Sequence, residues 1–530
     1  MKKLLLGDEA IAQGALDAGL SGVYAYPGTP STEITEYIQG YCKSTGEKIH
    51  NHWCTNEKTA MEAALGMSFA GKRALVCMKH VGLNVAADPF INSSITGVNG
   101  GIVVLVADDP SMHSSQDEQD SRFYGKFALL PVLEPSTQQE AYAMMGYAYD
   151  LSEELKLPVL MRTVTRLAHS RAVVELGTVR PQNKLNPVNG TKDWVLLPAI
   201  ARRRYASLIE KQDIIMDKAV NSPFNKYTQC QDKFKMGVIA CGNTYNYLQE
   251  CYPDGIDFPV LKLSQYPIPA NTVRQIAQQC STILVIEDGQ PFVEEQIKGI
   301  LPIECNVTGR LSGALPRTGE LNPDIVKAAL RMEQLPHLEK AETVVNRPPA
   351  LCQGCGHRSV YEAINIVVKE FPDAKVFGDI GCYTLGALPP YKALDSTVDM
   401  GASITMAKGA ADAGLFPAIA IIGDSTFTHS GMTGLLDAVN ANSPITVIIS
   451  DNLTTGMTGG QDSQGTGKFE AICQGIGVDP EHLKVVVPLP QNMEEITNIL
   501  RTEIAYKGLS VIIPRRECIQ TLKRKAKAKK

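Results

Sequence analysis

The chain has 530 residues, of which 44% are hydrophobic and 20% are charged, and its formal net charge is −5. That length predicts about three domains, each large enough to bury a core of its own. Six of the eight residues from Lys523 to Lys530 are basic, so the body of the chain is more acidic than the total suggests, which argues against nucleic acid as a partner.

The start of the chain predicts neither a signal peptide nor a membrane anchor. The apolar run Leu4 to Leu6 ends at Gly7-Asp8-Glu9, far short of the apolar region of a signal peptide. No later stretch approaches the roughly 20 apolar residues of a membrane span. Thirteen cysteines scattered along a long chain are typical of a reducing compartment, so we expect a cytoplasmic protein.

Residues 1–180 alternate short apolar runs with helical segments, which predicts a parallel sheet covered on both faces. Thr29 before Pro30 indicates one helix start, and Ser136 with Gln139 forms a possible capping box at another. The predicted strands are Val23 to Tyr26, Arg73 to Met78, Gly101 to Ala107 and Pro158 to Val164.

Two further α/β blocks are predicted. The smaller, at 236–308, has expected strands at 237–240, 259–263 and 282–287, and the larger, at 348–520, repeats the strand-helix alternation. Polar stretches without strand rhythm predict linkers, one with some helix at 181–235 and one at 309–347. The basic residues at 521–530 predict a solvated, disordered tail.

Polar residues follow two predicted strands of the last block. Gly423-Asp424-Ser425 ends the apolar run that starts at Ala418, and Asp451-Asn452 follows Ile445 to Ser450. Ligands bind open α/β sheets at such strand ends, and Mg²⁺ prefers oxygen ligands together with phosphates. Asp424 would supply a carboxylate, Asn452 an amide oxygen and Thr454 a backbone carbonyl. On these residues alone, polar turns without a cation are equally compatible.

Cysteines upstream of these strands indicate a metal or cluster. Cys352 and Cys355 are separated by two residues, and Cys382 follows the next predicted strand. A [4Fe-4S] cluster needs four thiolates, and zinc accepts the same ligands. Buried cysteines that only fill space are the third reading.

The Asp424 and Asn452 segments together resemble the signature of thiamin diphosphate enzymes, although Ser425 and Asp451 stand where that signature has Gly and Asn. With other motifs, the chain resembles over nearly its whole length the large-subunit family of indolepyruvate ferredoxin oxidoreductase, in the 2-oxoacid:ferredoxin oxidoreductase superfamily. Those motifs are Tyr26-Pro-Gly-Thr-Pro-Ser31, Asn56-Glu57-Lys58, Met78-Lys-His-Val-Gly-Leu-Asn84, Cys352-Gln-Gly-Cys-Gly-His-Arg358, Gly378-Asp-Ile-Gly-Cys382 and Gly423-Asp-Ser-Thr-Phe-Thr-His-Ser430.

The resemblance implies an α/β protein with three doubly wound domains. A pyrimidine-binding domain (1–180) and a diphosphate-binding domain (348–520) would clamp the cofactor, and 236–308 would be like the C-terminal domain of transketolase. Large subunits of that family usually continue into a ferredoxin-like segment with two four-cysteine motifs, whereas this sequence ends in lysines. Electrons are therefore expected to leave through a partner or another route.

Family roles carry over to individual residues. Glu57 falls where a glutamate hydrogen-bonds the cofactor's aminopyrimidine, and Thr29 matches a turn threonine that could bind the substrate. His80 is a further candidate to bind the acid group, with Lys79 and Asn84, because these residues end a predicted strand facing the expected cleft. Without the resemblance, Glu57 would be a first-turn residue of a helix and Thr29 a plain N-cap. Cys518 fits the fourth cluster position, with Cys473 as its rival. The residues expected around the diphosphate, besides the Mg²⁺ ligands, are His357, Gly378, Asp379, Ile380, Gly401, Ser403, Gly423 and Ser425.

The implied reaction is oxidative decarboxylation of an aryl 2-oxoacid such as indolepyruvate or phenylpyruvate, or its reversal. Its cofactors would be thiamin diphosphate, Mg²⁺ and one proximal [4Fe-4S] cluster, with coenzyme A as co-substrate. A small β subunit in a hetero-oligomer such as (αβ)2 and a ferredoxin-like carrier are the expected partners. Two alternatives are a non-oxidative decarboxylase or carboligase with the same cofactor, and a catalytically silent scaffold subunit.

Overall fold

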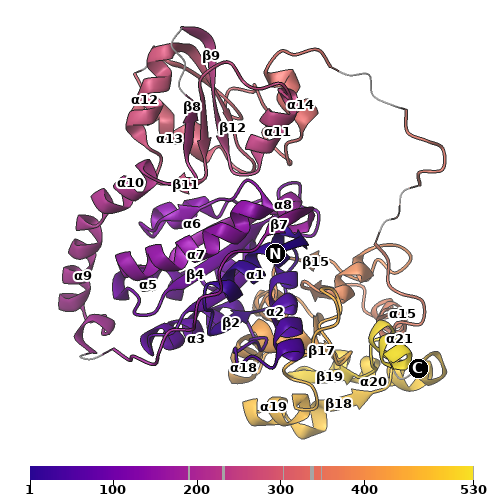
Figure 1. Ribbon diagram of the computed structural model, residues 1–530. Coiled ribbons are helices and arrows are strands. Elements are labelled where there is room, and N and C mark those ends of the chain that lie inside the picture. The colour runs from indigo at the N-terminus through magenta and orange to yellow at the C-terminus, as the bar shows by residue number, and fades with distance from the viewer. Residues whose placement is uncertain are drawn as a thin grey trace. The chain divides into compact units, whose positions relative to one another are not determined.

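The computed structural model describes residues 1–188, 191–228, 233–302, 304–334, 339–345, 347 and 349–528. The chain divides into two compact units, unit 1 from Met1 to Leu338 and unit 2 from Glu339 to Lys530, and each is described by itself (Figure 1). Within the described ranges, no helix is both long and apolar enough to cross a membrane. Each unit alternates strands and helices, so the α/β class predicted from the sequence is confirmed.

Unit 1 begins with a mostly parallel sheet in the strand order β11-β5-β6-β4-β3-β2. Every residue of β4 is buried because helices cover both faces of the sheet. The four strands predicted in this region are present, and their ends differ from the prediction by at most one residue. The strands are β2 (Gly22–Ala25), β3 (Ala74–Lys79), β4 (Ile102–Asp108), β5 (Val132–Leu133), β6 (Val159–Val164) and β11 (Gln265–Tyr266).

Helices of this domain follow the strands. The predicted caps are wrong by small shifts: α2 has its N-cap at Ser31 rather than Thr29, and α7 is capped by Thr137, whose hydroxyl accepts the Glu140 N–H. The helices are α1 (Gly7–Asp17), α2 (Thr32–Thr45), α3 (Glu57–Phe69), α4 (His80–Val85), α5 (Ala87–Thr96), α6 (Arg122–Phe127), α7 (Gln138–Leu155) and α8 (Thr165–His169). A separate antiparallel ribbon pairs β1 (Lys2–Leu6) with β7 (Arg171–Glu175).

The middle part of unit 1 holds a second sheet in the order β13-β12-β9-β10-β8. Its strands are β8 (Lys226–Thr228), β9 (Phe234–Cys241), β10 (Val260–Leu263), β12 (Cys280–Ile286) and β13 (Asn306–Thr308). Its helices are α11 (Thr244–Cys251), α12 (Ala270–Gln279), α13 (Phe292–Ile300) and α14 (Pro323–Ala329), and η1 (Thr191–Trp194), α9 (Pro198–Glu210) and α10 (Gln212–Val220) precede it. The predicted linker 181–235 therefore contains the expected helix but also β8, which pairs with β10 and was missed.

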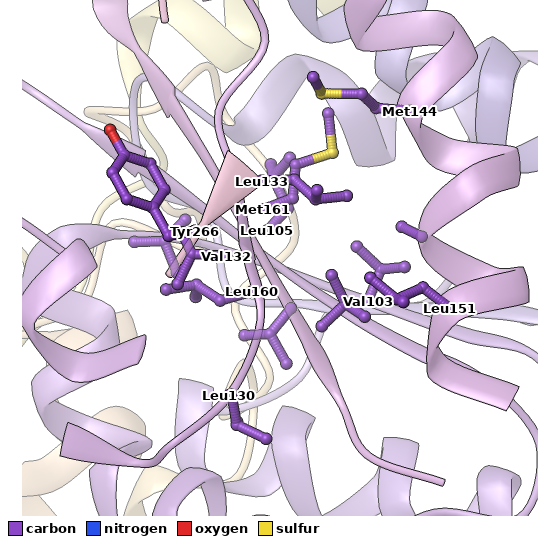
Figure 2. Close-up of a cluster of buried hydrophobic side chains, with 14 of the residues drawn as sticks. Val103, Leu105, Leu130, Val132, Leu133, Met144, Leu151, Leu160, Met161 and Tyr266 are labelled. Atoms are coloured by element: carbon purple, nitrogen blue, oxygen red, sulfur yellow. The ribbon is translucent and has the colours of Figure 1, made fainter. Parts of the chain in front are cut away.

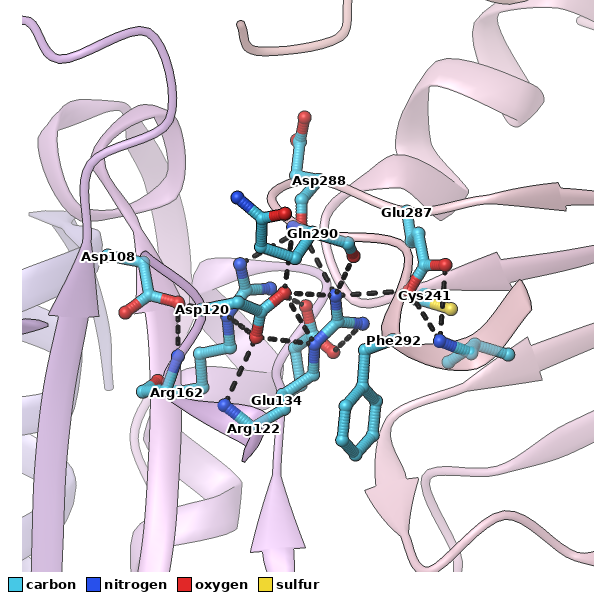
Figure 3. Close-up of polar contacts among 12 residues, drawn as sticks. Asp108, Asp120, Arg122, Glu134, Arg162, Cys241, Glu287, Asp288, Gln290 and Phe292 are labelled. Carbon is cyan, nitrogen blue, oxygen red and sulfur yellow. Dashed lines mark hydrogen bonds and ion pairs between the residues drawn. The ribbon is translucent and has the colours of Figure 1, made fainter. Parts of the chain in front are cut away.

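The two sheets of unit 1 are tied together by apolar and by charged contacts. Strand β11 comes from the middle segment yet pairs with β5, so Tyr266 joins the core beside Val132 and Leu160 (Figure 2). Beside it, Arg122 and Arg162 form a buried network with carboxylates of both parts (Figure 3). Both guanidinium groups also donate to the main-chain oxygen of Asp288, which follows β12.

Unit 2 is a parallel sheet in the order β15-β14-β16-β17-β19-β18. Its strands are β14 (Lys375–Gly378), β15 (Ser396–Thr397), β16 (Ala418–Gly423), β17 (Ile445–Ser450), β18 (Leu483–Val486) and β19 (Ser510–Pro514). Its helices are α15 (Gly356–Val368), η2 (Cys382–Ala387), α16 (Ala402–Asp412), α17 (Asp424–Thr426), η3 (Phe427–Gly431), α18 (Met432–Asn440), α19 (Phe469–Ile476), η4 (Pro480–His482), η5 (Pro490–Asn492), α20 (Met493–Ala505) and α21 (Ile519–Ala528).

The basic tail is not the disordered end that its composition predicts, because α21 extends to Ala528, with residues 529 and 530 outside the described range. Arg524 donates from Nη1 to the main-chain oxygen of Gly459, and Lys525 pairs with Glu517 at 2.6 Å. These contacts give the positive charges partners that composition alone does not reveal.

Candidate active site

Strand order places the unit 2 site. From β14 the chain moves outward to β15, on one side of the sheet. It then returns to β16, on the other side of β14, and continues away from it to β17, so the direction of the connections reverses between β14 and β16. Ligands of open α/β sheets bind at the carboxyl ends of the strands at such a switch point. Asp379 directly follows β14 and Asp424 directly follows β16, and these two strands are parallel neighbours. The predicted phosphate and cation residues therefore meet at the edge where a ligand is expected.

Asp424, Asn452 and Thr454 are brought together as the sequence predicts. The two carboxylate oxygens of Asp424 accept the N–H groups of Ser425 at 2.7 Å and Thr454 at 3.0 Å, and the Thr454 N–H also lies 3.2 Å from Oδ1 of Asn452. Burial, more than the neighbouring Asp451 charge, raises the pKa of Asp424 to about 7. A divalent cation at this carboxylate would offset that desolvation.

Ser425 departs from the glycine of the thiamin diphosphate signature, and the structure gives its side chain a partner. Its hydroxyl lies 2.9 Å from that of Thr455, so it joins the turn after β16 to the loop after β17. Position 423 has no room for a side chain, because a Cβ on Gly423 would lie 2.6 Å from the ring of Tyr383. The ring of Tyr383, which sequence reasoning did not single out, thus packs against this turn and lies 6.2 Å from the ring of His357.

The neighbouring turn after β14 holds a second buried carboxyl group, that of Asp379. One oxygen of Asp379 accepts the Ser403 hydroxyl at 2.7 Å, whereas the other is buried without a hydrogen-bond partner among the described residues. Burial raises the pKa of Asp379 to about 8. Gly401, with φ of 99°, begins α16 as its N-cap, and the main-chain N–H groups of Gly401 and Ser403 at this helix start bond to the Asp379 carboxyl group.

His357 gives the clearest sign of a bound ligand. Its ring is 3% exposed, yet neither ring nitrogen has a hydrogen-bond partner among the described residues. Burial lowers its pKa to about 4, so the ring is neutral at physiological pH. Burying an imidazole without hydrogen-bond partners costs free energy, and a bound diphosphate group would supply an acceptor for a ring N–H. The residues of unit 2 therefore fit thiamin diphosphate with Mg²⁺.

Four cysteines lie near these turns. Burial, and then the thiols of Cys518, Cys355 and Cys352, raise the pKa of Cys382 to about 12, which identifies the four groups as close neighbours. Sγ of Cys382 lies next to the loop after β17, since a Cβ on Gly456 would lie 3.3 Å from it. The structure thus assembles the predicted set of cysteines next to the predicted Mg²⁺ ligands.

The distances between these thiols help to distinguish a zinc site from an iron-sulfur cluster. A tetrahedral zinc site places sulfur atoms about 3.8 Å apart, whereas in the described part of the chain no three of these thiols lie within 4.8 Å of one another. A four-iron cluster is larger than one ion and holds its thiolates farther apart. Cys473, the rival fourth ligand, is instead fully buried in an apolar cluster with Phe427 and Phe469.

Unit 1 gathers the predicted pyrimidine and substrate residues at the ends of the parallel strands β2 and β3. Glu57 begins α3 and is 4% exposed, which excludes the reading of a solvated first-turn residue. Gly82 leaves room for it, because a Cβ there would lie 2.6 Å from Oε1 of Glu57. Burial lowers the pKa of Lys79, and the nearby carboxylates, among them Glu57, oppose this shift.

The turn that holds Thr29 lies beside Lys79. A Cβ on Gly28, the residue before Thr29, would lie 3.3 Å from Cγ of Lys79. Nε2 of His80 is 3.2 Å from both the main-chain oxygen and Oδ1 of Asp117, which fixes the ring. Nδ1 of His80 is buried without a hydrogen-bond partner within the described ranges. Thr29, Glu57 and His80 are thus all placed at this strand end, as the sequence predicts.

Comparisons with known proteins match a thiamine pyrophosphate-binding family in each unit. Residues 13–194 match the family described as pyruvate flavodoxin/ferredoxin oxidoreductase, thiamine diP-binding, and residues 379–513 match the C-terminal TPP-binding domain of thiamine pyrophosphate enzymes. Indolepyruvate oxidoreductase subunit IorA of Archaeoglobus fulgidus is 40% identical over 98% of this chain and 86% of its own length. The same subunit of Methanothermobacter thermautotrophicus is 37% identical, over 98% and 87%.

A solved structure shares the fold. The 2-oxoglutarate:ferredoxin oxidoreductase from Magnetococcus marinus, with 2-oxoglutarate, coenzyme A and succinyl-CoA bound, superposes with a TM-score of 0.50 at 15% identity, over 62% of this chain and 65% of that one. The fold and the two matched domains define a thiamine pyrophosphate-dependent 2-oxoacid oxidoreductase. Within that class, the chain belongs to the family of indolepyruvate oxidoreductase subunit IorA.

Proposed function

We propose that this chain is the catalytic subunit for oxidative decarboxylation of an aryl 2-oxoacid, of the indolepyruvate or phenylpyruvate type, to its acyl-CoA. The aryl preference rests on relatives named indolepyruvate oxidoreductase at 37–40% identity over nearly the whole chain. Each turnover releases CO₂, joins the acyl group to coenzyme A and passes two electrons to a ferredoxin-like carrier, or runs in reverse.

One observation carries the redox part of this proposal. The thiol of Cys382 lies beside Gly456, in the same loop as Asn452, and the thiols of Cys352, Cys355 and Cys518 are near enough to raise its pKa. A [4Fe-4S] cluster held by Cys352, Cys355, Cys382 and Cys518 would therefore lie next to the diphosphate-binding loops. The non-oxidative alternative has no use for four gathered thiols, so the structure favours the oxidoreductase.

Residues of the chain have distinct tasks in this proposal. When bound, thiamin diphosphate supplies a carbon nucleophile and an electron sink. Asp424, Asn452 and the main chain of Thr454 would hold Mg²⁺, with His357 and the unpaired oxygen of Asp379 near the diphosphate. Glu57 would accept a hydrogen bond from the aminopyrimidine.

Substrate binding falls to the turn of Thr29 and to its neighbours. Nδ1 of His80 is a buried atom without a partner among the described residues; when both ring nitrogens carry a proton, it would donate to a substrate carboxylate or carbonyl, and Lys79 would add positive charge. Burial strengthens such charge interactions because water is excluded. We further propose the domain roles expected from the resemblance, together with a small β subunit in a hetero-oligomer.

The test is anaerobic co-expression with a candidate small subunit from a neighbouring gene, followed by viologen reduction with a panel of 2-oxoacids. We expect reduction that needs both coenzyme A and the acid, with indolepyruvate or phenylpyruvate turned over fastest. Aldehyde formation without dye reduction would instead identify a non-oxidative decarboxylase. Activity that is unchanged by Glu57→Gln would identify a scaffold subunit.

A further inference from the structure

A cluster of possible metal ligands lies in unit 1 apart from the site described above. Asp8, Glu33 and His169 each offer one ligand atom, and these three atoms all lie within 4.8 Å of one another. They come from three elements: the first turn of α1, the first turn of α2 and the last residue of α8. No role in the proposed reaction uses them.

The main chain explains why these elements meet. Gly7, the first residue of α1, donates its N–H to the carbonyl of Ser170 at 3.1 Å. A Cβ on Gly7 would lie 2.1 Å from the carbonyl oxygen of Leu167, so only glycine allows α1 to approach α8 this closely. Asp8 is thereby held near His169.

Asp8 is the observation that points to a ligand. Its side chain is 0% exposed, and neither carboxylate oxygen has a hydrogen-bond partner among the residues that the structure describes. Oε2 of Glu33 is likewise buried without a hydrogen bond there, and it lies 3.5 Å from Nε2 of His169. A buried carboxylate without donors is strongly destabilising unless a proton or a cation compensates it.

We propose that Asp8, Glu33 and His169 bind a divalent first-row transition metal such as Zn²⁺. Carboxylate oxygens and imidazole nitrogen are ligands that Zn²⁺ takes, and three protein ligands leave a position for water. The imidazole favours a transition metal over Mg²⁺ or Ca²⁺, which prefer oxygen ligands alone. Two carboxylates also balance the charge of the cation.

Two of the three proposed ligands are partly exposed. The side chains of Glu33 and His169 are 37% and 33% exposed, whereas Asp8 forms the buried floor, so an ion can enter past the two partly exposed ligands. A metal here would fix the first turn of α2 against α1 and α8. Because α2 begins directly after the turn that holds Thr29, the ion would also restrain that turn.

The test uses the intact complex, treated with chelator, supplied with Mg²⁺ and then titrated with Zn²⁺. X-ray absorption distinguishes this site from the four thiols, because zinc–oxygen and zinc–nitrogen bonds are about 2.0–2.2 Å and zinc–sulfur bonds about 2.3 Å. We expect one zinc per chain with only nitrogen and oxygen ligands, and a rise in the melting temperature on its addition.

Matched variants decide the assignment. Glu33→Gln and Asp8→Asn should weaken zinc binding at least tenfold, whereas Glu36→Gln, which changes an exposed carboxylate on the same helix, should leave it unchanged. If the Asp8→Asn variant does not fold, the His169→Gln variant takes its place in the test, because His169 is an exposed ligand. Zinc that is bound only through sulfur would overturn the proposal. Equal zinc affinity of Glu33→Gln and the unmodified chain would also overturn it.

Discussion

Arg515 holds Asp451 in place: its Nε donates to Oδ2 of this buried carboxylate at 2.6 Å. The terminal nitrogens of Arg515 each bind an oxygen of Glu470 at 2.7 Å. Asp451 stands where the thiamin diphosphate signature has asparagine, and this ion pair gives the substituted carboxylate its partner. The main chain continues the link, since the N–H of Cys518 donates to the carbonyl of Asn452 at 3.0 Å. This hydrogen bond joins Asn452, a proposed Mg²⁺ ligand, to Cys518, a proposed cluster ligand.

Arg515→Met should therefore destabilise unit 2 and weaken cofactor binding. Removing one partner of a fully buried ion pair costs about 3–5 kcal/mol, and because Arg515 is 28% exposed we expect about 1–3 kcal/mol. Chemical denaturation and a titration with thiamin diphosphate plus Mg²⁺ measure both effects. Arg501→Met is the matched control, because its partner Glu370 and Arg501 itself are both about two-fifths exposed. Equal effects of the two variants would refute the role of Asp451.

Local sequence predicted the strands well because buried parallel strands are continuous apolar runs. Strands β16 and β17 have the bounds that the apolar residues indicate, and with them Asp424 and Asn452 fall at strand ends. The contacts of Arg515 with Asp451 and of Tyr383 with Gly423 were not predictable, since each joins residues far apart in sequence. The same holds for β8, whose three residues gain their strand pairing only from β10.

Cys518→Ser should remove the cluster, whereas Cys473→Ser should leave it. Cys518 is grouped with the three other thiols, but Cys473 is packed among apolar side chains. Iron and acid-labile sulfide in anaerobically purified protein are the measurement, and we expect Cys518→Ser to lose most of both and nearly all dye reduction. Loss of iron in Cys473→Ser with retention in Cys518→Ser would reverse the assignment.

Glu57→Gln should lower kcat by at least about 100-fold, because a neutral amide cannot replace the carboxylate in an acid-base contact. Gly82→Ala should act in the same direction, since its Cβ would displace Oε1 of Glu57. Glu62→Gln, an exposed change on the same helix, is the control and should keep normal activity. Steady-state viologen reduction tests all three. A Glu57→Gln enzyme as active as the control would exclude Glu57 from catalysis.

The network that joins the two sheets of unit 1 should make its stability depend on pH. Burial raises the pKa of Glu287 to about 7, although Arg122 and the N–H groups of Val293 and Glu294 oppose the shift. A carboxyl whose pKa is higher in the folded state binds more protons there than when unfolded. The contribution of Glu287 to the free energy of unfolding must therefore fall as pH rises from about 4.5 to about 7.

Glu287→Gln imitates the protonated side chain, so it should reduce this fall in stability. Asp288, whose pKa burial raises to about 6, should keep part of the pH dependence. Denaturation of the variant and the unmodified chain at several pH values between 5 and 8 measures the difference, which should grow in favour of the variant as pH rises. A difference that is constant across this range would mean that Glu287 does not titrate there, and that Arg122 holds it ionised throughout.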